Sequence, residues 1–291
     1  TQRENQYTAL CERHRLGTTL LIINFEIMKK IAFFSLVVFC FSLLSCGGKT
    51  KSADAGNQQK DTVDMQQDYI KPDIYETSGG PLKATLVGHG SLMFEYGGKI
   101  IHIDPYSQVA DYSKLPKADL IMLTHEHSDH LDTAAINMIK KDDTHFIVSK
   151  VCNEILGYGE VMNNGDHSHW GTLHIDAVPA YNMVNKKPDG EAYHPKGRGN
   201  GYVFTFADKK VYVAGDTENI PEMDVLKGRI DIAYMPKNLP YTMTDEMFVD
   251  AVKKVEPKVV YPYHMSEFDQ EKIGKALEGL NTKIEVRAMK N

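Results

Sequence analysis

Short runs of apolar residues, separated by glycine-rich turns, recur between Pro81 and Asn291, and this pattern predicts β-strands. The predicted strands are Lys83–Val87, Ser91–Tyr96, Lys99–Asp104, Trp170–Val178, Gly201–Phe206 and Lys210–Ala214. The run Leu120–Leu123 contains only apolar residues, which is typical of a strand that is buried on both faces. Val259–Tyr263 is a further buried strand by the same pattern.

Two segments carry apolar residues at helical spacing. The first has its stripe at Leu131, Ala134, Ala135, Met138 and Ile139, and the second at Met247, Phe248, Ala251, Val252 and Val255. Thr242, with Asp245 three residues later, predicts the amino-terminal cap of the second helix. Meandering strands, followed by strands that alternate with helices, favour an α/β fold of two packed sheets with helices outside.

The amino-terminal part of the chain has the features of a secretory signal. Met28–Lys30 is basic, and Ile31–Leu44 is almost continuously apolar but too short to span a bilayer comfortably. Residues 43–46, Leu-Leu-Ser-Cys, resemble a bacterial lipobox. This motif implies cleavage before Cys46 and attachment of lipid to its sulfur.

We therefore expect residues 1–27 to be a leader that is either not native to the protein or upstream sequence assigned to it by mistake, 28–45 a lipoprotein signal peptide, 46–80 a flexible tether and 81–291 the folded domain. The tether is too poor in large apolar residues to offset the entropy of ordering. A lipid anchor at Cys46 predicts a membrane-bound protein of the bacterial cell envelope, facing the periplasm or the exterior. A transmembrane anchor is the alternative, and it also places the domain outside the cytoplasm.

Cysteine usage and charge narrow the function further. Of the four cysteines only Cys152 lies in the predicted domain, so the core rather than a disulfide must hold the fold. Cys152 is expected to be a packing residue. The net charge of −6, without a local cluster of Lys and Arg, argues against nucleic acid as a partner.

The strand Leu120–Leu123 leads into the hexapeptide His-Glu-His-Ser-Asp-His at residues 125–130. Side chains alternate in extended backbone, so His125 and His127 can bind one cation together. Asp129 and the last histidine can address a second cation nearby. Imidazole and carboxylate ligands suit zinc, iron, manganese or nickel rather than calcium. The hexapeptide therefore predicts a metal site.

Other residues of ligand type follow other predicted strands. Asp216 comes after the strand that begins at Lys210, His264 follows Val259–Tyr263, and Asp104 ends a third strand. Each has an ordinary explanation when taken alone: a Gly-Asp turn, a core histidine, or a loop cap that could also orient a ligand. Together they place acidic or imidazole groups at four strand ends, a repetition that packing does not require.

These motifs resemble those of metallo-β-lactamase-fold hydrolases, over the stretch from about Leu82 to His264. Within that family the chain is most similar to the branch that includes L-ascorbate-6-phosphate lactonase-like proteins. The matching segments are Gly88-His89-Gly90-Ser91, Ile103-Asp104-Pro105, Thr124 with residues 125–130, Ala214-Gly215-Asp216-Thr217 and Pro262-Tyr263-His264. The resemblance implies a four-layer αββα sandwich with a binuclear metal site between the two sheets.

The resemblance also implies the ligands of two divalent transition-metal ions, with zinc favoured and manganese, iron or nickel as alternatives. The implied ligands are His125 and His127 at the first ion, Asp129, His130 and His264 at the second, and Asp216 as the bridge between them.

One ligand of the family's pattern is missing. The first ion normally takes a third His after the strand Trp170–Val178, where this chain has Asn182, whose amide is a weaker zinc ligand. His194 is a later histidine in the polar segment Asn182–Gly199, and long loops of this kind are usually functional or disordered. We predict that the loop folds over the ions as a substrate lid and brings His194 to the first ion. A loop histidine that contacts solvent or substrate is the alternative.

Five further residues are assigned from their local sequence. His89 has glycine on both sides, which permits close backbone approach, and it is a candidate to support a ligand or to contact substrate. Tyr241 lies in the loop before the last capped helix and could line the pocket or simply pack. His167 and His169 predict a surface turn, with metal scavenging as the minor alternative, and His102 predicts a half-buried strand residue.

We expect a metal-dependent hydrolase in which a metal-bound hydroxide attacks a lactone, ester, amide or phosphodiester. Catalytic roles fall to Asp129, Asp216 and His194. The expected partner is a small-molecule or lipid substrate, and export favours one found in the envelope or the environment. A non-catalytic metal-binding envelope lipoprotein is the alternative. A di-iron redox protein is disfavoured, because the usual flavin-binding partner domain is absent.

Replacing Cys46 by Ser should release the protein from membranes, because the sulfur that carries the lipid is lost. Fractionation of cells and mass spectrometry of the amino-terminal peptide test this expectation. Cys152→Ser is the matched control and should remain membrane-bound. A mature chain that still contains Ile31–Leu44 would exclude a lipoprotein.

Overall fold

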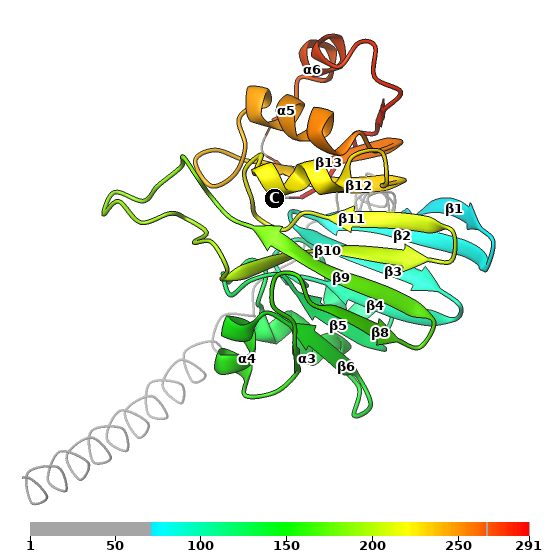
Figure 1. The fold of residues 1–291 in the computed structure, drawn as a ribbon. Coiled ribbons are helices and arrows are strands. Elements are labelled where there is room, and N and C mark those ends of the chain that lie inside the picture. Colours follow the sequence, from blue (N-terminus) through cyan, green and yellow to red (C-terminus); the bar gives the residue numbers. More distant parts are fainter. Residues whose placement is uncertain (1–70, 266, 291) are drawn as a thin grey trace, which may run out of the picture. The chain divides into compact units, whose positions relative to one another are not determined.

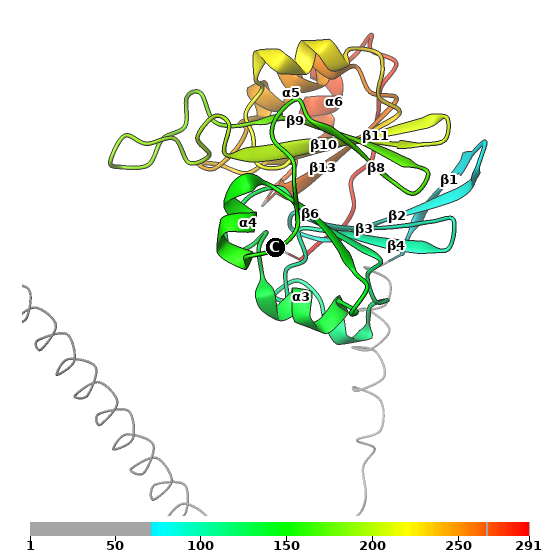
Figure 2. The ribbon, with the colours of Figure 1, turned by 60° about the horizontal axis from the view of Figure 1, so that its bottom comes forward.

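Two β-sheets pack face to face in this protein, with helices on both outer sides (Figures 1 and 2). The computed structural model describes residues 71–265 and 267–290. The predicted leader, the predicted signal peptide, Cys46 and most of the predicted tether lie outside these residues. In the part of the chain that is described, no helix has the length and apolar character needed to cross a membrane.

Within the described residues, the first sheet consists of seven strands in chain order. They are β1 Asp73–Thr77, β2 Gly80–Gly88, β3 Ser91–Tyr96, β4 Lys99–Ile103, β5 Leu120–Leu123, β6 His145–Val148 and β7 Glu160–Val161. β1 to β4 pair antiparallel, and β4 to β7 pair parallel. Parallel strands end at the same edge of a sheet, so the segments that follow β4 and β5 emerge side by side.

The second sheet repeats this plan with seven strands of the described chain. They are β8 His167–Trp170, β9 Leu173–Ala180, β10 Gly199–Phe206, β11 Lys209–Val213, β12 Ile232–Lys237, β13 Val259–Met265 and β14 Lys283–Ile284. β8 to β11 pair antiparallel, whereas β11 to β14 pair parallel. The ends of β11 and β13 therefore also lie at a common edge.

Helices cover the outer faces of the two sheets (Figure 2). The elements are α3 Thr133–Ile139 and α4 Lys150–Leu156 against the first sheet, α5 Asp245–Val255 and α6 Gln270–Ala276 against the second, and the 3₁₀ turns η2 Tyr112–Lys114 and η3 Pro221–Leu226. In α3 the predicted stripe is partly wrong, since Ala134 and Met138 are exposed and Ile136 is buried instead.

The core is layered because buried strands point alternate side chains to opposite faces. In β5, Leu120 and Met122 enter the core between the sheets, whereas Ile121 and Leu123 pack in the layer that holds α3 and α4. Phe248 of α5 belongs to the corresponding layer on the second sheet. This arrangement confirms the predicted four-layer αββα sandwich.

Cys152 of α4 is a packing residue, as expected. Its side chain is buried in the outer layer of the first sheet. Burial raises the pKa of the thiol to about 12, so it stays protonated and inert at neutral pH.

Residues 71–80 differ from the predicted tether, which extends to residue 80. Asp73–Thr77 forms an edge strand in register with β2. The hydroxyl oxygens of Tyr75 and Tyr261 lie 2.5 Å apart, and an Asp73 carboxylate oxygen lies 2.6 Å from the Arg287 guanidinium. These partners lie far along the chain, so local composition does not reveal them. The folded domain begins before Pro81.

Three other local predictions are wrong in detail. The predicted strand from Trp170 is a hairpin, because Gly171 turns the chain between β8 and β9 with a φ of 60°. His167 and His169 belong to β8 rather than to a turn, although both are exposed. The cap of α5 is Thr244, which accepts the Met247 N–H, and not Thr242.

His102 of β4 is fully buried rather than half-buried, with 1% of its surface exposed. Its Nε2–H donates to the Pro116 carbonyl over 3.0 Å. Burial lowers the pKa of His102 to about 4, because a charged imidazole would lose its hydration there.

Acid should therefore destabilise the fold through His102. Between pH 6.5 and 4 the unfolded chain binds a proton that the folded chain does not, so the free energy of unfolding falls by up to about 3 kcal/mol as the pH is lowered. Urea unfolding of the metal-free protein should show a shallower loss for His102→Gln. His145→Gln, which replaces a histidine at the surface, should keep the wild-type slope. An unchanged slope in His102→Gln would contradict this assignment.

Candidate metal centre

Strand ends from both sheets bring the predicted ligands together. His125 follows β5 of the first sheet, whereas Asp216 follows β11 and His264 lies in β13 of the second. His194 arrives from the loop between β9 and β10. All four side chains are buried.

The first group of potential ligands consists of His125, His127 and His194. One ring nitrogen from each of the three lies within 4.8 Å of the others. His194 Nε2 and His127 Nδ1 are 3.2 Å apart. The loop between β9 and β10 thus folds back and places His194 beside His125 and His127. In the family's pattern a histidine at the position of Asn182 would fill this place.

The second group consists of His89, Asp129, His130 and His264, whose ligand atoms also lie within 4.8 Å of one another. His264 Nε2 is 3.4 Å from Asp129 Oδ2, and His130 Nε2 is 3.6 Å from the same oxygen. His89 Nε2 is hydrogen-bonded to this oxygen over 2.9 Å. The turn between β2 and β3 therefore adds an imidazole to the three expected ligands.

Asp216 lies between the two groups. Its Oδ2 is 3.3 Å from His194 Nε2 and 3.3 Å from His264 Nε2, while Oδ1 is 3.4 Å from His130 Nε2. A carboxylate has two oxygens, so this residue can face two cations at once.

Several buried polar atoms at the centre have no hydrogen-bond partner within the described structure. They are Nε2 of His125, Nε2 of His130, Nε2 of His264 and Oδ1 of Asp216. Buried polar atoms are nearly always paired, because an unpaired one costs free energy. Two ligands of a tetrahedral zinc ion lie about 3.3 Å apart, which is close to the separations seen here. The donor set therefore fits divalent transition-metal ions.

The protonation of His125 and of the two carboxylates suits cations, whereas the carboxylates of Asp216 and Asp104 outweigh burial and hold the pKa of His130 well above its usual value. Burial, reinforced by the neighbouring His130, holds the pKa of His125 well below its usual value, so the imidazole stays neutral. Burial alone would raise the pKa of Asp216, but His264 and His130 outweigh it and hold the pKa well below the usual range. For Asp129, hydrogen bonds with His264 and His89 outweigh burial in the same way and lower its pKa.

Asp104, which follows β4, holds the ring of His130 and the start of the next loop by hydrogen bonds. Its Oδ2 accepts the Nδ1–H of His130 over 2.8 Å, which turns Nε2 of that ring toward the centre. The carboxylate also accepts the backbone N–H of Thr124 over 2.8 Å and its hydroxyl over 2.5 Å. Asp104 thus ties the end of β4 to the start of the loop after β5.

Backbone strain marks the same place. His89, Asp104 and His264 each adopt a φ of 46°, a left-handed conformation that is rare for residues other than glycine. Gly90 is needed for a different reason. A Cβ atom at this position would lie 2.7 Å from His130 Cε1, so any side chain would displace that ring.

Asn182 orients His194 rather than replacing it. Its Oδ1 accepts both the backbone N–H of His194, over 3.0 Å, and the Nδ1–H of the ring, over 2.6 Å. With Nδ1 protonated, Nε2 keeps a lone pair directed at His127 and Asp216. The amide nitrogen of Asn182 donates to Glu218 and to the Tyr241 carbonyl.

Glu218 is a buried site residue that the sequence analysis missed. Its carboxylate accepts the backbone N–H groups of Met183, Val184 and Asn185 over 2.7, 2.8 and 2.6 Å. It thereby anchors the first turn of the loop that carries His194. The only signal in the sequence was an acidic residue two positions after Asp216, and this signal is too weak without the path of the loop.

A pocket open to solvent adjoins the first group of ligands, and His125, His127 and His194 are part of its lining. Tyr193, Pro195 and Arg198 contribute to its wall, and the Arg198 guanidinium lies 2.6 Å from Glu126. Tyr241 packs its ring edge-on against Tyr193, with the centroids 5.1 Å apart. The loop that carries His194 therefore also forms part of the pocket wall.

Comparisons with known proteins agree with this geometry. The model of the family described as "Beta-lactamase superfamily domain" matches residues 83–264. A UPF0173 metal-dependent hydrolase of Archaeoglobus fulgidus is 28% identical over 224 residues, which cover 72% of this chain and 96% of the relative. One from Flavobacterium johnsoniae is 32% identical over 201 residues, covering 64% of this chain and 86% of the relative.

A solved structure shows the same likeness in three dimensions. It is the crystal structure of a metal-dependent hydrolase from Parabacteroides distasonis, with 42% sequence identity and a TM-score of 0.72. The match covers 76% of this chain and 100% of that chain.

Replacing Asn182 by Ala should weaken metal binding at the group of His125, His127 and His194. Loss of a residue that orients a ligand typically lowers metal affinity about 10–100-fold, and we expect a loss in this range. Competition with a chromogenic chelator measures it. Asn153→Ala is the control, since the side chain of Asn153, in α4, donates to the Gly159 carbonyl and to no ligand among the described hydrogen bonds. Equal affinity in both variants would show that Asn182 does not act through His194.

Proposed function

This chain belongs to the metallo-β-lactamase superfamily, and we propose that it is a hydrolase that uses two divalent transition-metal ions, zinc being favoured. The proposed substrates are lactones, esters, amides or phosphodiesters. The names of the similar proteins, which call them metal-dependent hydrolases, support the reaction class.

One observation carries the proposal: buried imidazole and carboxylate atoms without partners converge from both sheets around Asp216. A site built only for stability would pair or exclude these atoms. We assign His125, His127 and His194 to one ion and Asp129, His130 and His264 to the other. Asp216 would contact both.

When bound, such ions lower the pKa of a coordinated water to about 7 and polarise the substrate oxygen. The chain's own residues supply the orientation. His89 Nε2–H donates to Oδ2 of Asp129 and so would fix the orientation of that carboxylate beside the second ion. His194 lines the open pocket and would also face the substrate. We see no need for a serine nucleophile in this scheme.

An apolar rim supports a substrate with an apolar portion. Met183, Val184, Leu239 and Tyr241 are exposed large apolar side chains on the two loops that Asn182 and Glu218 connect to the centre. Apolar side chains exposed on loops that are tied to the centre would suit the apolar portion of a substrate. With the lipid anchor proposed at Cys46, a lipid or another envelope substrate fits this rim better than a polar metabolite.

A non-catalytic metal-binding lipoprotein is the second candidate. The reason to consider it is that Asn182 stands where the family has the third histidine ligand of the first ion. The position of His194 makes this candidate weaker, because the group of His125, His127 and His194 provides three imidazoles without residue 182.

Replacing Asp216 by Asn should lower kcat/KM about a thousandfold or more, because it removes the charge shared by both ions. The test combines elemental analysis with a panel of a lactone, a nitrophenyl ester, an anilide and bis-nitrophenyl phosphate. Metal stoichiometry should fall in parallel. Asp143→Asn, at an exposed carboxylate, is the matched control and should leave both quantities unchanged.

We expect the wild type to turn over at least one of these probes. A chelator should abolish this turnover, and added metal should restore it. If the wild-type protein binds metal in a way that depends on Asp216 but turns over none of the probes, the non-catalytic candidate is favoured. Unchanged metal content in Asp216→Asn would exclude the bridging role.

A further inference from the structure

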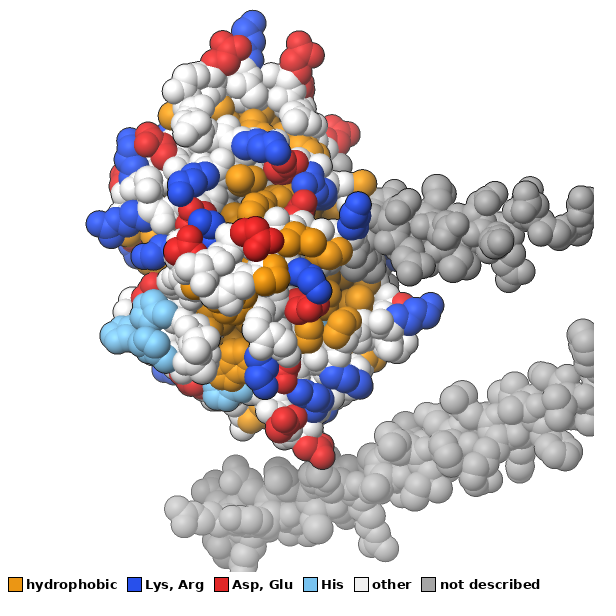
Figure 3. Space-filling view, turned by 90° about the vertical axis from the view of Figure 1, so that its right-hand side faces the viewer, with side chains coloured by type: hydrophobic (Ala, Val, Ile, Leu, Met, Phe, Trp, Pro, Cys, Tyr) orange, Lys and Arg blue, Asp and Glu red, His pale blue; other side chains and the backbone are white. Residues whose placement is uncertain are grey.

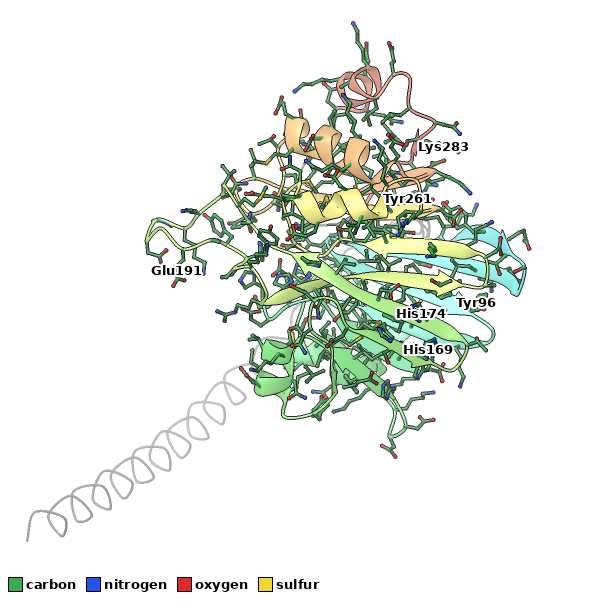
Figure 4. The ribbon with its side chains drawn as sticks, in the orientation of Figure 1. Tyr96, His169, His174, Glu191, Tyr261 and Lys283 are labelled. Carbon is green, nitrogen blue, oxygen red and sulfur yellow. The ribbon has the colours of Figure 1, made fainter. Side chains whose placement is uncertain are left out.

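Three histidines and an aspartate share one face of the β8–β9 hairpin, away from the centre. In the antiparallel register His167 is opposite Asp176, and His169 is opposite His174. Leu173 and Ile175 point into the core between the sheets, so the intervening side chains point outward. Figure 3 shows histidine side chains gathered at the surface, and Figure 4 shows His169 and His174 side by side on neighbouring strands.

The two central histidines are spaced as metal ligands. His169 Nε2 and His174 Nδ1 lie 3.1 Å apart and share a hydrogen bond, which an ion bound between them would replace, and their ring centroids lie 4.6 Å apart. Two nitrogens bound to one zinc ion lie about 3.3 Å apart in a tetrahedral shell. A small side-chain rotation would therefore admit an ion between them.

Asp176 prepares His174 for this role. Its Oδ1 is 3.0 Å from His174 Nε2, so it accepts the proton of that nitrogen. The proton on Nε2 leaves the lone pair on Nδ1, the atom that faces His169. A carboxylate that orients a histidine in this way is a recurring support of metal ligands.

His167 can complete the set. It lies two residues before His169, on the same exposed face, and its ring centroid is 6.1 Å from that of His174. Rotation of this exposed side chain would bring a third imidazole to the ion. No lysine or arginine forms an ion pair with Asp176 among the described contacts, and His174 is its only salt-bridge partner there.

We propose that His169 and His174, with His167 as the third ligand and Asp176 as the orienting carboxylate, form a second metal site for a divalent zinc, nickel or copper ion. Imidazole ligands select these borderline ions over magnesium and calcium. The site joins the edge strand β8 to β9, so an ion there clamps the end of the second sheet. It is independent of the hydrolytic centre and of the function proposed for it.

The test uses the untagged protein with its centre loaded with zinc and free metal removed. Isothermal titration with zinc should then show one additional ion in the wild type, which is lost in the double variant His169→Asn/His174→Asn. Asp176→Ala should bind this ion about 10–100-fold more weakly, as expected for loss of an orienting residue. The melting temperature should rise with added zinc in the wild type and not in the double variant.

His145→Asn is the matched control, because His145 is partly exposed and bonds Glu160 but has no second imidazole among its described contacts. It should bind the additional ion like the wild type. Equal binding by the wild type and the double variant, or an equal loss in His145→Asn, would overturn the proposal. The difference in zinc binding between the variants does not depend on how many ions the centre holds. Hydrolysis by the double variant should equal that of the wild type.

Discussion

The environment of the Asp216 carboxylate is the constraint on which the rest of the structure depends. An isolated buried charge is costly, and Asp216 is only 4% exposed. Imidazoles from three separate segments, carrying His130, His194 and His264, approach it within 3.4 Å. No single element could supply these neighbours. The site can exist only where the carboxyl ends of strands from two sheets meet, and the αββα sandwich provides this meeting point.

The apolar layers supply the rigidity that the centre needs. Three residues near the ligands hold a left-handed backbone, and several buried nitrogens lack partners, so the centre by itself is destabilising in the absence of cations. The core between the sheets and the two outer layers offset this cost. Asp104 and Gly90 then set the His130 ring, the first by a hydrogen bond and the second by leaving room for it.

Control of His194 is separate from control of the other ligands. The residues after β5 and β11 are positioned by the sheets, whereas His194 is positioned by a loop whose turn is anchored by Glu218 and whose end is held by Asn182. The same loop carries apolar residues at its surface and part of the pocket wall. The proposed contact with substrate and the completion of the first ligand group therefore both depend on this one loop.

The sequence by itself determined most of the strands around the centre, the buried character of β5 and the cluster that follows it, because these depend on periodicity and on residues adjacent in the chain. Only the tertiary structure decided what depends on distant partners. It pairs Asp73 with Arg287, so the folded domain begins before its predicted first residue, Pro81. It also assigns Asn182 to orientation and brings His194 to the ligand group. These outcomes follow from the path of the 182–199 loop, which Glu218 sets through backbone hydrogen bonds that no residue pattern encodes.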